Sequence, residues 1–147
     1  MQIKLKKLNP LAIIPQYQTV GSAGFDFHSV IDCVLKAGEL ALIPTGLALE
    51  LPQDYELQIR PRSGLALNDA ISVLNTPATI DSDYRGEIKV ILINHSKKDF
   101  VINIGDRIAQ GVVNRIYQVS FVECDALNET TRGNKGFGSS GVRMEDK

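Results

Sequence analysis

The chain has 147 residues, 44% of them hydrophobic, and a formal net charge of −1 at pH 7. This length suits one domain with a substantial core, and the near-zero charge excludes a general basic surface for nucleic acid. The two cysteines, Cys33 and Cys124, have no spacing typical of a disulfide framework or a zinc site, so we expect a reduced, cytoplasmic protein. The N-terminus lacks the features of a signal peptide, and no apolar run is long enough for a membrane span, so no membrane partner is expected.

Short strands with turn signals dominate the first part of the chain. Ile3 and Leu5 alternate with lysines, which predicts a strand with one solvated face. Residues 38–60 contain three apolar segments separated by Pro-Thr-Gly and Pro-Gln-Asp turns. No long stretch has a helical period, and the only helix expected is one or two turns after Ser63. This pattern predicts an all-β sandwich or barrel.

A first polar candidate lies in GSAGFDFHS, residues 21–29. In a strand, Phe25 and Phe27 face one way and Asp26 faces the other. Asp26 is then either a solvated strand residue or a carboxylate that reaches Mg²⁺ through water, as in sites with few protein carboxylates. These residues alone leave both interpretations open.

A second candidate is the turn Pro61-Arg62-Ser63-Gly64, which leads into the expected helix. Ser63 is a candidate N-cap, which would be a purely structural role. An arginine, a hydroxyl group and the free N–H groups of a helix N-terminus also suit a phosphate group. The turn therefore predicts either a plain helix start or a phosphate-binding segment.

The densest polar cluster lies in NTPATIDSDYRGEI, residues 75–88. Asp81, Asp83, Tyr84 and Arg85 fall within five positions, between two apolar strand-like runs. Polar groups on a bend held by rigid strands are typical of catalytic sites. A solvated turn with a surface ion pair is the alternative interpretation.

Four further strands are predicted after this cluster. Residues 87–94 have little polar content, which predicts a strand buried on both faces. Residues 100–113 predict two strands joined by a bend at Asp106, and residues 115–123 predict the last strand. Asp106 is either a turn residue or a group that orients an arginine. Gln110 is either a strand residue or a group that binds a phosphate or water.

The composition changes after residue 125. RGNKGFGSSG, residues 132–141, contains four glycines in ten positions and cannot bury enough apolar surface to stay ordered by itself. An unordered terminus is the simplest interpretation. The alternative is an arm that folds over a bound nucleotide, with Arg132 contacting phosphates and Phe137 stacking on a base.

Five segments in this order, AGFDFHS, PRSGL, NTPATIDSDYRGEI, GDRIAQ and RGNKGFGSSG, resemble the motifs of the trimeric dUTPase family, and the resemblance covers nearly the whole chain. It implies a jelly-roll-like β-barrel with one short helix over residues 1–128 and a flexible glycine-rich arm over residues 129–147 that closes over the active site. It also implies Mg²⁺-dependent hydrolysis of dUTP to dUMP and pyrophosphate, which limits uracil incorporation into DNA and supplies dUMP for dTMP synthesis. The expected assembly is a homotrimer whose active sites are shared between subunits.

The resemblance further implies a role for each matched position. Asp81 would be the general base that orients the attacking water, Asp26 would hold Mg²⁺ through water, and Asp106 would support the site structurally. Asn75 would read the uracil edge, Tyr84 would pack against the deoxyribose and exclude a 2′-hydroxyl, and Phe137 would stack on the uracil. The residues expected to bind the substrate are Arg62, Ser63, Gly64, Asn75, Thr79, Ile80, Tyr84, Gln110, Arg132, Phe137, Gly138, Ser139 and Ser140.

The chain departs from the family pattern at two positions. Ser140 stands where the family often has threonine, and serine keeps the hydroxyl group. Ala78 stands where the family often has glycine, next to the turn expected to read the base. Its methyl group would make any conformation with positive φ costly.

Two alternatives to a dUTPase remain. A dCTP deaminase would share the fold but needs a catalytic glutamate in the region of residues 81–87, where this chain has the dUTPase pattern IDSDY. A nucleotide-binding module without catalysis is the second alternative, and the intact Asp81 and glycine-rich tail argue against it.

Overall fold

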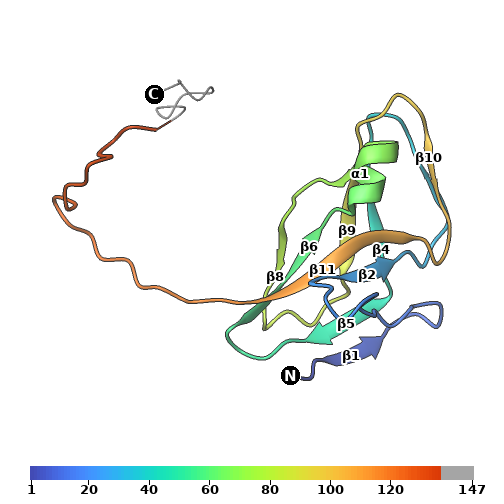
Figure 1. Cartoon of the computed structure of the whole chain (residues 1–147). Helices are drawn as coiled ribbons and strands as arrows, with labels where there is room; N and C mark the ends of the chain where they lie inside the picture. The colour runs from blue at the N-terminus through green and yellow to red at the C-terminus, as the bar shows by residue number, and fades with distance from the viewer. Residues whose placement is uncertain (137–147) are drawn as a thin grey trace.

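The computed structural model describes residues 1–136, and Figure 1 shows them as short strands wrapped around one core with a single short helix. The elements are β1 (Lys4–Lys7), β2 (Phe25–His28), β3 (Cys33–Leu35), β4 (Leu40–Pro44), β5 (Leu47–Glu50), β6 (Tyr55–Arg60), α1 (Ser63–Asp69), β7 (Ile71–Val73), β8 (Ala78–Ile80), β9 (Lys89–Asn94), β10 (Phe100–Ile102) and β11 (Arg107–Arg115). The all-β prediction is therefore confirmed. Among residues 1–136, no helix is long and apolar enough to cross a membrane.

The strands form four small antiparallel sheets, ordered β1-β5, β10-β3, β2-β11-β6-β8 and β4-β9-β7. In the largest sheet, β11 is paired on both of its edges, with β2 and with β6. Gly111 lies at the middle of β11, where a Cβ atom would stand 2.7 Å from both Phe25 and Phe27 and 3.0 Å from Leu57. The absence of a side chain at Gly111 therefore lets the two aromatic rings pack against the sheet.

The core consists of residues that alternate along these strands. Phe27, Leu57, Ile59, Leu92 and Ile108 are each no more than 2% exposed. Their period of two places one face of each strand against the core, as the sequence pattern predicts. The strands expected near Ile3 and within residues 38–60 are confirmed as β1, β4, β5 and β6.

The strand expected at residues 87–94 is shorter and less buried than predicted. It begins at Lys89, and only its alternate residues Val90, Leu92 and Asn94 are fully buried. Burial on both faces was the wrong prediction, because Ile91 and Ile93, which lie on the other face of the strand, are only partly buried by residues 1–136.

The strand predicted at residues 115–123 is absent from the described part of the chain. β11 ends at Arg115, whose partner Tyr55 is the first residue of β6. Beyond this pair β11 has no neighbouring strand to continue the ladder, so the chain leaves the sheets as an exposed segment (Figure 1).

Candidate functional site

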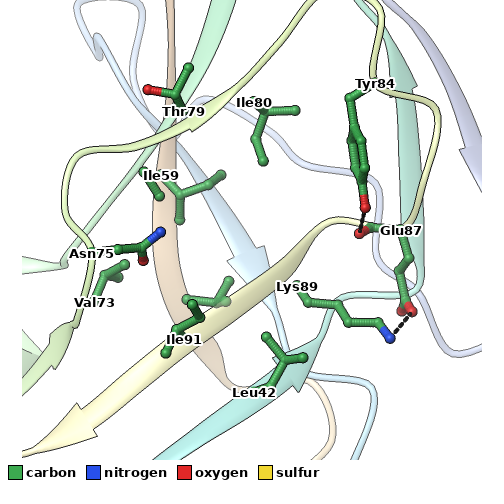
Figure 2. Close-up of a pocket in the computed structure, with 12 residues that line it drawn as sticks. Leu42, Ile59, Val73, Asn75, Thr79, Ile80, Tyr84, Glu87, Lys89 and Ile91 are labelled. Carbon is green, nitrogen blue, oxygen red and sulfur yellow. Dashed lines mark hydrogen bonds and ion pairs between the residues drawn. The ribbon is translucent and has the colours of Figure 1, made fainter.

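A pocket of about 350 Å³ opens beside β8 and the bend that follows it. Figure 2 shows polar groups from β8, the bend and β9 around an apolar wall. This β8 pocket is lined by Leu42, Ile59, Val73, Asn75, Ala78, Thr79, Ile80, Tyr84, Glu87, Lys89, Val90 and Ile91. Four residues expected to bind the substrate, Asn75, Thr79, Ile80 and Tyr84, are thus brought together in one cavity.

Tyr84 forms one wall of the β8 pocket. Its hydroxyl group donates a hydrogen bond of 3.0 Å to the carbonyl oxygen of Glu87, and the residue is 45% exposed. The ring lies across Gly86, where an added Cβ atom would overlap the phenol. Gly86 therefore permits the ring position that places one side of Tyr84 toward the pocket.

The bend between β8 and β9 is held by contacts within it and with a neighbouring turn. Arg85 Nη1 donates to the carbonyl oxygens of Ser82, at 2.6 Å, and Tyr84, at 2.9 Å. Glu87 Oε1 accepts a hydrogen bond of 2.9 Å from the backbone N–H of Gly46. Asp81 is exposed at the start of this bend, directly after β8. Its carboxylate is therefore open to solvent and can accept a hydrogen bond from a water molecule.

A second group of polar residues, the Asp26 cluster, consists of Asp26, Arg62, Arg107 and Gln110. Asp26 is only 8% exposed, and its carboxylate lies 2.9 Å from Arg62 Nε and 3.4 Å from Arg107 Nη1. Gln110 is the register partner of Asp26 and donates a hydrogen bond of 2.8 Å to the carbonyl oxygen of Pro61. Asp26 is therefore not a solvated strand residue, because two cations hold its carboxylate.

His28 borders this cluster as the register partner of Arg107. Burial lowers the pKa of His28; the Asp26 carboxylate opposes this shift, while Arg107 and Arg62 add to it. The lowered pKa favours a neutral imidazole at pH 7. His28 therefore adds no positive charge beside the two guanidinium groups and one carboxylate of the Asp26 cluster.

Asp106 acts as a turn residue, the simpler of its two interpretations, whereas Ser63 is not the N-cap of the helix. Asp106 accepts hydrogen bonds of 2.7 and 3.2 Å from the backbone and side chain of Asn103, so it closes the turn before β11. The N-cap of α1 is Arg62, without a side-chain cap bond, and Ser63 is the first helical residue. The N-cap role expected of Ser63 was therefore wrong, because the helix begins one residue earlier than that role requires.

Ala78 is not strained. Ala78 lies in β8 and pairs with Ile59 of β6. It is not among the non-glycine residues with positive φ in residues 1–136, which are Asp54 and Ala70. Because β8 is extended at this position, the methyl group carries no conformational penalty.

The structure separates the expected site residues into two groups. The β8 pocket lies at the β8 edge of the sheet β2-β11-β6-β8, whereas Asp26 lies on β2 at the other edge, where it is reached by Arg107 of β11 and by Arg62, which follows β6. Adjacent strands lie about 4.8 Å apart, so the edge strands β2 and β8 lie roughly 14 Å apart across the sheet. Ser63 and Gly64 follow Arg62 at the start of α1 and are exposed.

Arg132, which belongs to the described part of the tail, is brought to neither group. Arg132 is exposed and donates to the carbonyl oxygen of Lys135 at 3.0 Å. Phe137, Gly138, Ser139 and Ser140 lie outside the described residues.

Two polar residues of the site were missed by sequence reasoning. Arg107 was not among the expected site residues, yet it binds Asp26, which lies 81 positions earlier in the chain. Glu87 was assigned to a buried strand, yet its carboxylate binds Gly46, 41 positions earlier. Their position next to other motif residues was the only local signal, because both contacts depend on how the strands pair.

The residues of the Asp26 cluster fit only one mode of Mg²⁺ binding. Within residues 1–136 there is no group of three His, Cys, Asp or Glu side chains arranged to hold a metal. Asp26 is a single carboxylate that is already paired with two guanidinium groups, so a Mg²⁺ beside it would take most of its ligands from water and a bound polyphosphate.

Asp26 should also matter for stability. We expect Asp26→Ala to lower the free energy of unfolding by about 1–3 kcal/mol, because it leaves two partly exposed guanidinium groups without their carboxylate. Asp99→Ala is the control, because Asp99 pairs with Lys36 at 2.8 Å in full solvent and should contribute less. Urea unfolding of both variants measures the difference, and equal losses would contradict a structural role for the Asp26 pairs.

Comparisons with known proteins agree with this geometry. The dUTPase family profile matches residues 11–141. The chain is 57% identical over 142 residues to deoxyuridine 5′-triphosphate nucleotidohydrolase of Helicobacter pylori (strain J99), covering 97% of this chain and 98% of the relative. It is 60% identical over 142 residues to the protein of the same name from Helicobacter hepaticus, and the match covers 97% of this chain and 90% of that relative.

A solved structure has the same fold. The dUTPase of Staphylococcus bacteriophage 80alpha, solved with dUPNHPP, superposes with a TM-score of 0.86 at 25% identity and covers 96% of this chain and 99% of that one. With the family profile and near full-length relatives in agreement, the chain belongs to the dUTPase family.

Proposed function

We propose that this protein hydrolyses dUTP to dUMP and pyrophosphate, and thereby limits uracil incorporation into DNA and supplies dUMP for dTMP synthesis. Relatives that are 57% and 60% identical over nearly the whole chain are named for this activity. The observation within the chain that carries the proposal is the β8 pocket, where Asn75, Thr79, Ile80 and Tyr84 converge, with Asp81 directly after β8. A small pocket with apolar walls and a few convergent polar groups suits a nucleoside.

The pocket would hold the deoxyuridine part of the substrate. Among residues 1–136, β8 pairs only with β6, so one edge of its backbone is available to read the uracil edge together with Asn75. Tyr84 would pack against the deoxyribose, and its ring would leave no space for a 2′-hydroxyl. The apolar wall excludes water from the base.

The Asp26 cluster would face the phosphates. Arg62 and Gln110 belong to it, and Ser63 and Gly64 follow with backbone N–H groups at the start of α1, where helices leave these donors unpaired. A triphosphate carries about four negative charges, which guanidinium groups bind well. Asp26 would hold Mg²⁺ through water, and this ion would supply neutralisation of the phosphate charge.

Asp81 would orient the attacking water and accept its proton. The oxygen of that water forms a new bond to phosphorus, and the bond between the α-phosphate and the pyrophosphate leaving group breaks. Phosphoryl transfer depends mainly on positioning and electrostatic stabilisation, so one oriented carboxylate is sufficient as the base. Arg62 would stabilise the charge that develops on the phosphate oxygens.

We further propose that each site is built from several copies of the chain in a homotrimer. The β8 pocket and Asp26 lie on opposite edge strands of one sheet, so a substrate that contacts both is more simply bound between two chains. Segment 116–127 leaves the sheets with Tyr117, Phe121 and Leu127 more than 80% exposed, which suits burial on another copy. Residues 129–147 would then form an arm that closes over a neighbour's site, with Arg132, Ser139 and Ser140 on the terminal phosphate and Phe137 and Gly138 at the base.

The direct test is pyrophosphate release from dUTP, dCTP, dTTP and UTP with Mg²⁺. A site that hydrogen-bonds the uracil edge leaves polar groups unpaired when cytosine binds, so kcat/KM should favour dUTP over dCTP by up to about 10⁴-fold. UTP should also be rejected, through Tyr84. Comparable hydrolysis of all four would refute the roles of Asn75 and Tyr84, and ammonia release from dCTP would indicate a deaminase instead.

The role of Asp81 is tested by Asp81→Asn. We expect the variant to fold and to bind dUTP while its turnover falls by about 10²–10⁴-fold, the usual effect of losing a general base. Asp83→Asn is the matched control, because Asp83 is an exposed carboxylate in the same bend. Near wild-type turnover in Asp81→Asn would show that another group is the base.

The shared site is tested by mixing two inactive proteins, Asp81→Asn and a chain truncated after residue 128. After joint unfolding and refolding, some sites should combine an intact Asp81 from one chain with an intact arm from another, so activity should return. Each protein refolded alone is the control. No recovery in verified mixed trimers would refute sharing of the site between chains, and would leave the role of Asp81 untouched.

A further inference from the structure

Glu87 joins the bend between β8 and β9, which carries Tyr84, to the turn between β4 and β5. Its carboxylate accepts the backbone N–H of Gly46 at 2.9 Å and lies 3.5 Å from Lys89 Nζ, while its own carbonyl oxygen accepts the Tyr84 hydroxyl at 3.0 Å (Figure 2). One residue thus contacts both the aromatic wall of the β8 pocket and a turn outside the pocket.

The turn that receives Glu87 is firmly held. Gly46 has φ of +67°, and a Cβ atom there would stand 2.7 Å from Asn9 and 2.9 Å from Ala12, so the backbone is packed closely at this point. The residues on either side, Thr45 and Leu47, also bind the chain next to Glu87: Thr45 Oγ1 donates to the Ile88 carbonyl at 2.7 Å, and Ile88 N–H donates to the Leu47 carbonyl at 2.8 Å.

Of these three contacts between the bend and the turn, the one made by Glu87 depends on a charged side chain, and a substitution can remove it. Without its carboxylate, the Gly46 N–H loses its acceptor and the bend loses one attachment to the turn. Ile88 would keep the bend in place, so the protein should still fold. The carbonyl group that fixes the Tyr84 hydroxyl would then be held by Ile88 alone, and the ring would occupy a wider range of positions.

We propose that Glu87 is a positioning residue that fixes Tyr84 against the substrate sugar and so sets the discrimination between deoxyribonucleotides and ribonucleotides. The proposal rests on the proposed hydrolysis of dUTP. A 2′-hydroxyl group is excluded only if the Tyr84 ring leaves too little space for one oxygen atom. Small displacements of the ring should therefore change the selectivity between dUTP and UTP before they change the rate of the chemical step. Asp81, at the other end of the bend, keeps its place after β8.

The test compares kcat/KM for dUTP and UTP in Glu87→Ala and in Glu87→Gln. In Glu87→Ala, the preference for dUTP over UTP should fall about tenfold, mainly through KM. Glutamine keeps an oxygen acceptor for Gly46, so Glu87→Gln should stay within about twofold of the wild type. Glu87→Asp keeps the charge but not the reach, and it replaces Glu87→Ala if that variant does not fold.

Asp99→Ala is the matched control. Asp99 also accepts a backbone N–H, that of Ala37 at 3.1 Å, and pairs with a lysine at 2.8 Å, but it does not line the β8 pocket. Its loss should leave the preference for dUTP unchanged. A general loosening of the fold would affect both variants and both substrates alike.

A double-mutant cycle identifies the route of the effect. If Glu87 acts through the Tyr84 hydroxyl, Glu87→Ala should change the preference by less than about twofold in a Tyr84→Phe background. Additive effects, or an unchanged preference in Glu87→Ala, would overturn the proposal. Absence of dUTP hydrolysis in the wild type would instead refute the proposed function.

Discussion

The pairing of β11 on both of its edges is the constraint on which the rest of the structure depends. This strand holds β2 on one side and β6 on the other, and β6 in turn holds β8. The pairing is possible because Gly111 leaves room for Phe25 and Phe27 beneath the sheet. One central strand thus fixes both the position of the buried Asp26 and, through β6, the position of the β8 pocket.

The antiparallel register of β11 brings charged and polar side chains next to Asp26. Gln110 lies opposite Asp26 on one side and opposite Arg60 on the other, and Arg107 reaches Asp26 from the start of the same strand. A carboxylate this deeply buried needs compensating charges, and Arg62 and Arg107 provide them. Guanidinium groups also bind phosphate well, so under the proposed function the same arginines would face the phosphates of dUTP.

The β8 pocket is held together by different contacts. β8 is an edge strand, and the bend after it is held by hydrogen bonds from the Arg85 side chain to backbone carbonyl oxygens rather than by a strand ladder. Tyr84 therefore owes its position to a short chain of contacts through Glu87 to the turn at Gly46. Such an arrangement places a rigid aromatic group beside an open strand edge, which suits the recognition of a small base and its sugar.

Much of this protein is determined by local sequence. Alternating apolar residues and turn-forming triplets define the strands before Ser63, because a strand's period of two and the conformations of proline and glycine are local properties. The motifs around Asp26, Asp81 and Gln110 identify the dUTPase family because they occur together in one order along the chain.

Only the tertiary structure decided the contacts between distant segments. The ion pair of Arg107 with Asp26 spans 81 positions and the bond from Gly46 to Glu87 spans 41, and both follow from strand pairing that no local pattern encodes. The end of β11 at Arg115 was likewise decided by the start of β6 at Tyr55, because a strand continues only where a partner can receive its hydrogen bonds.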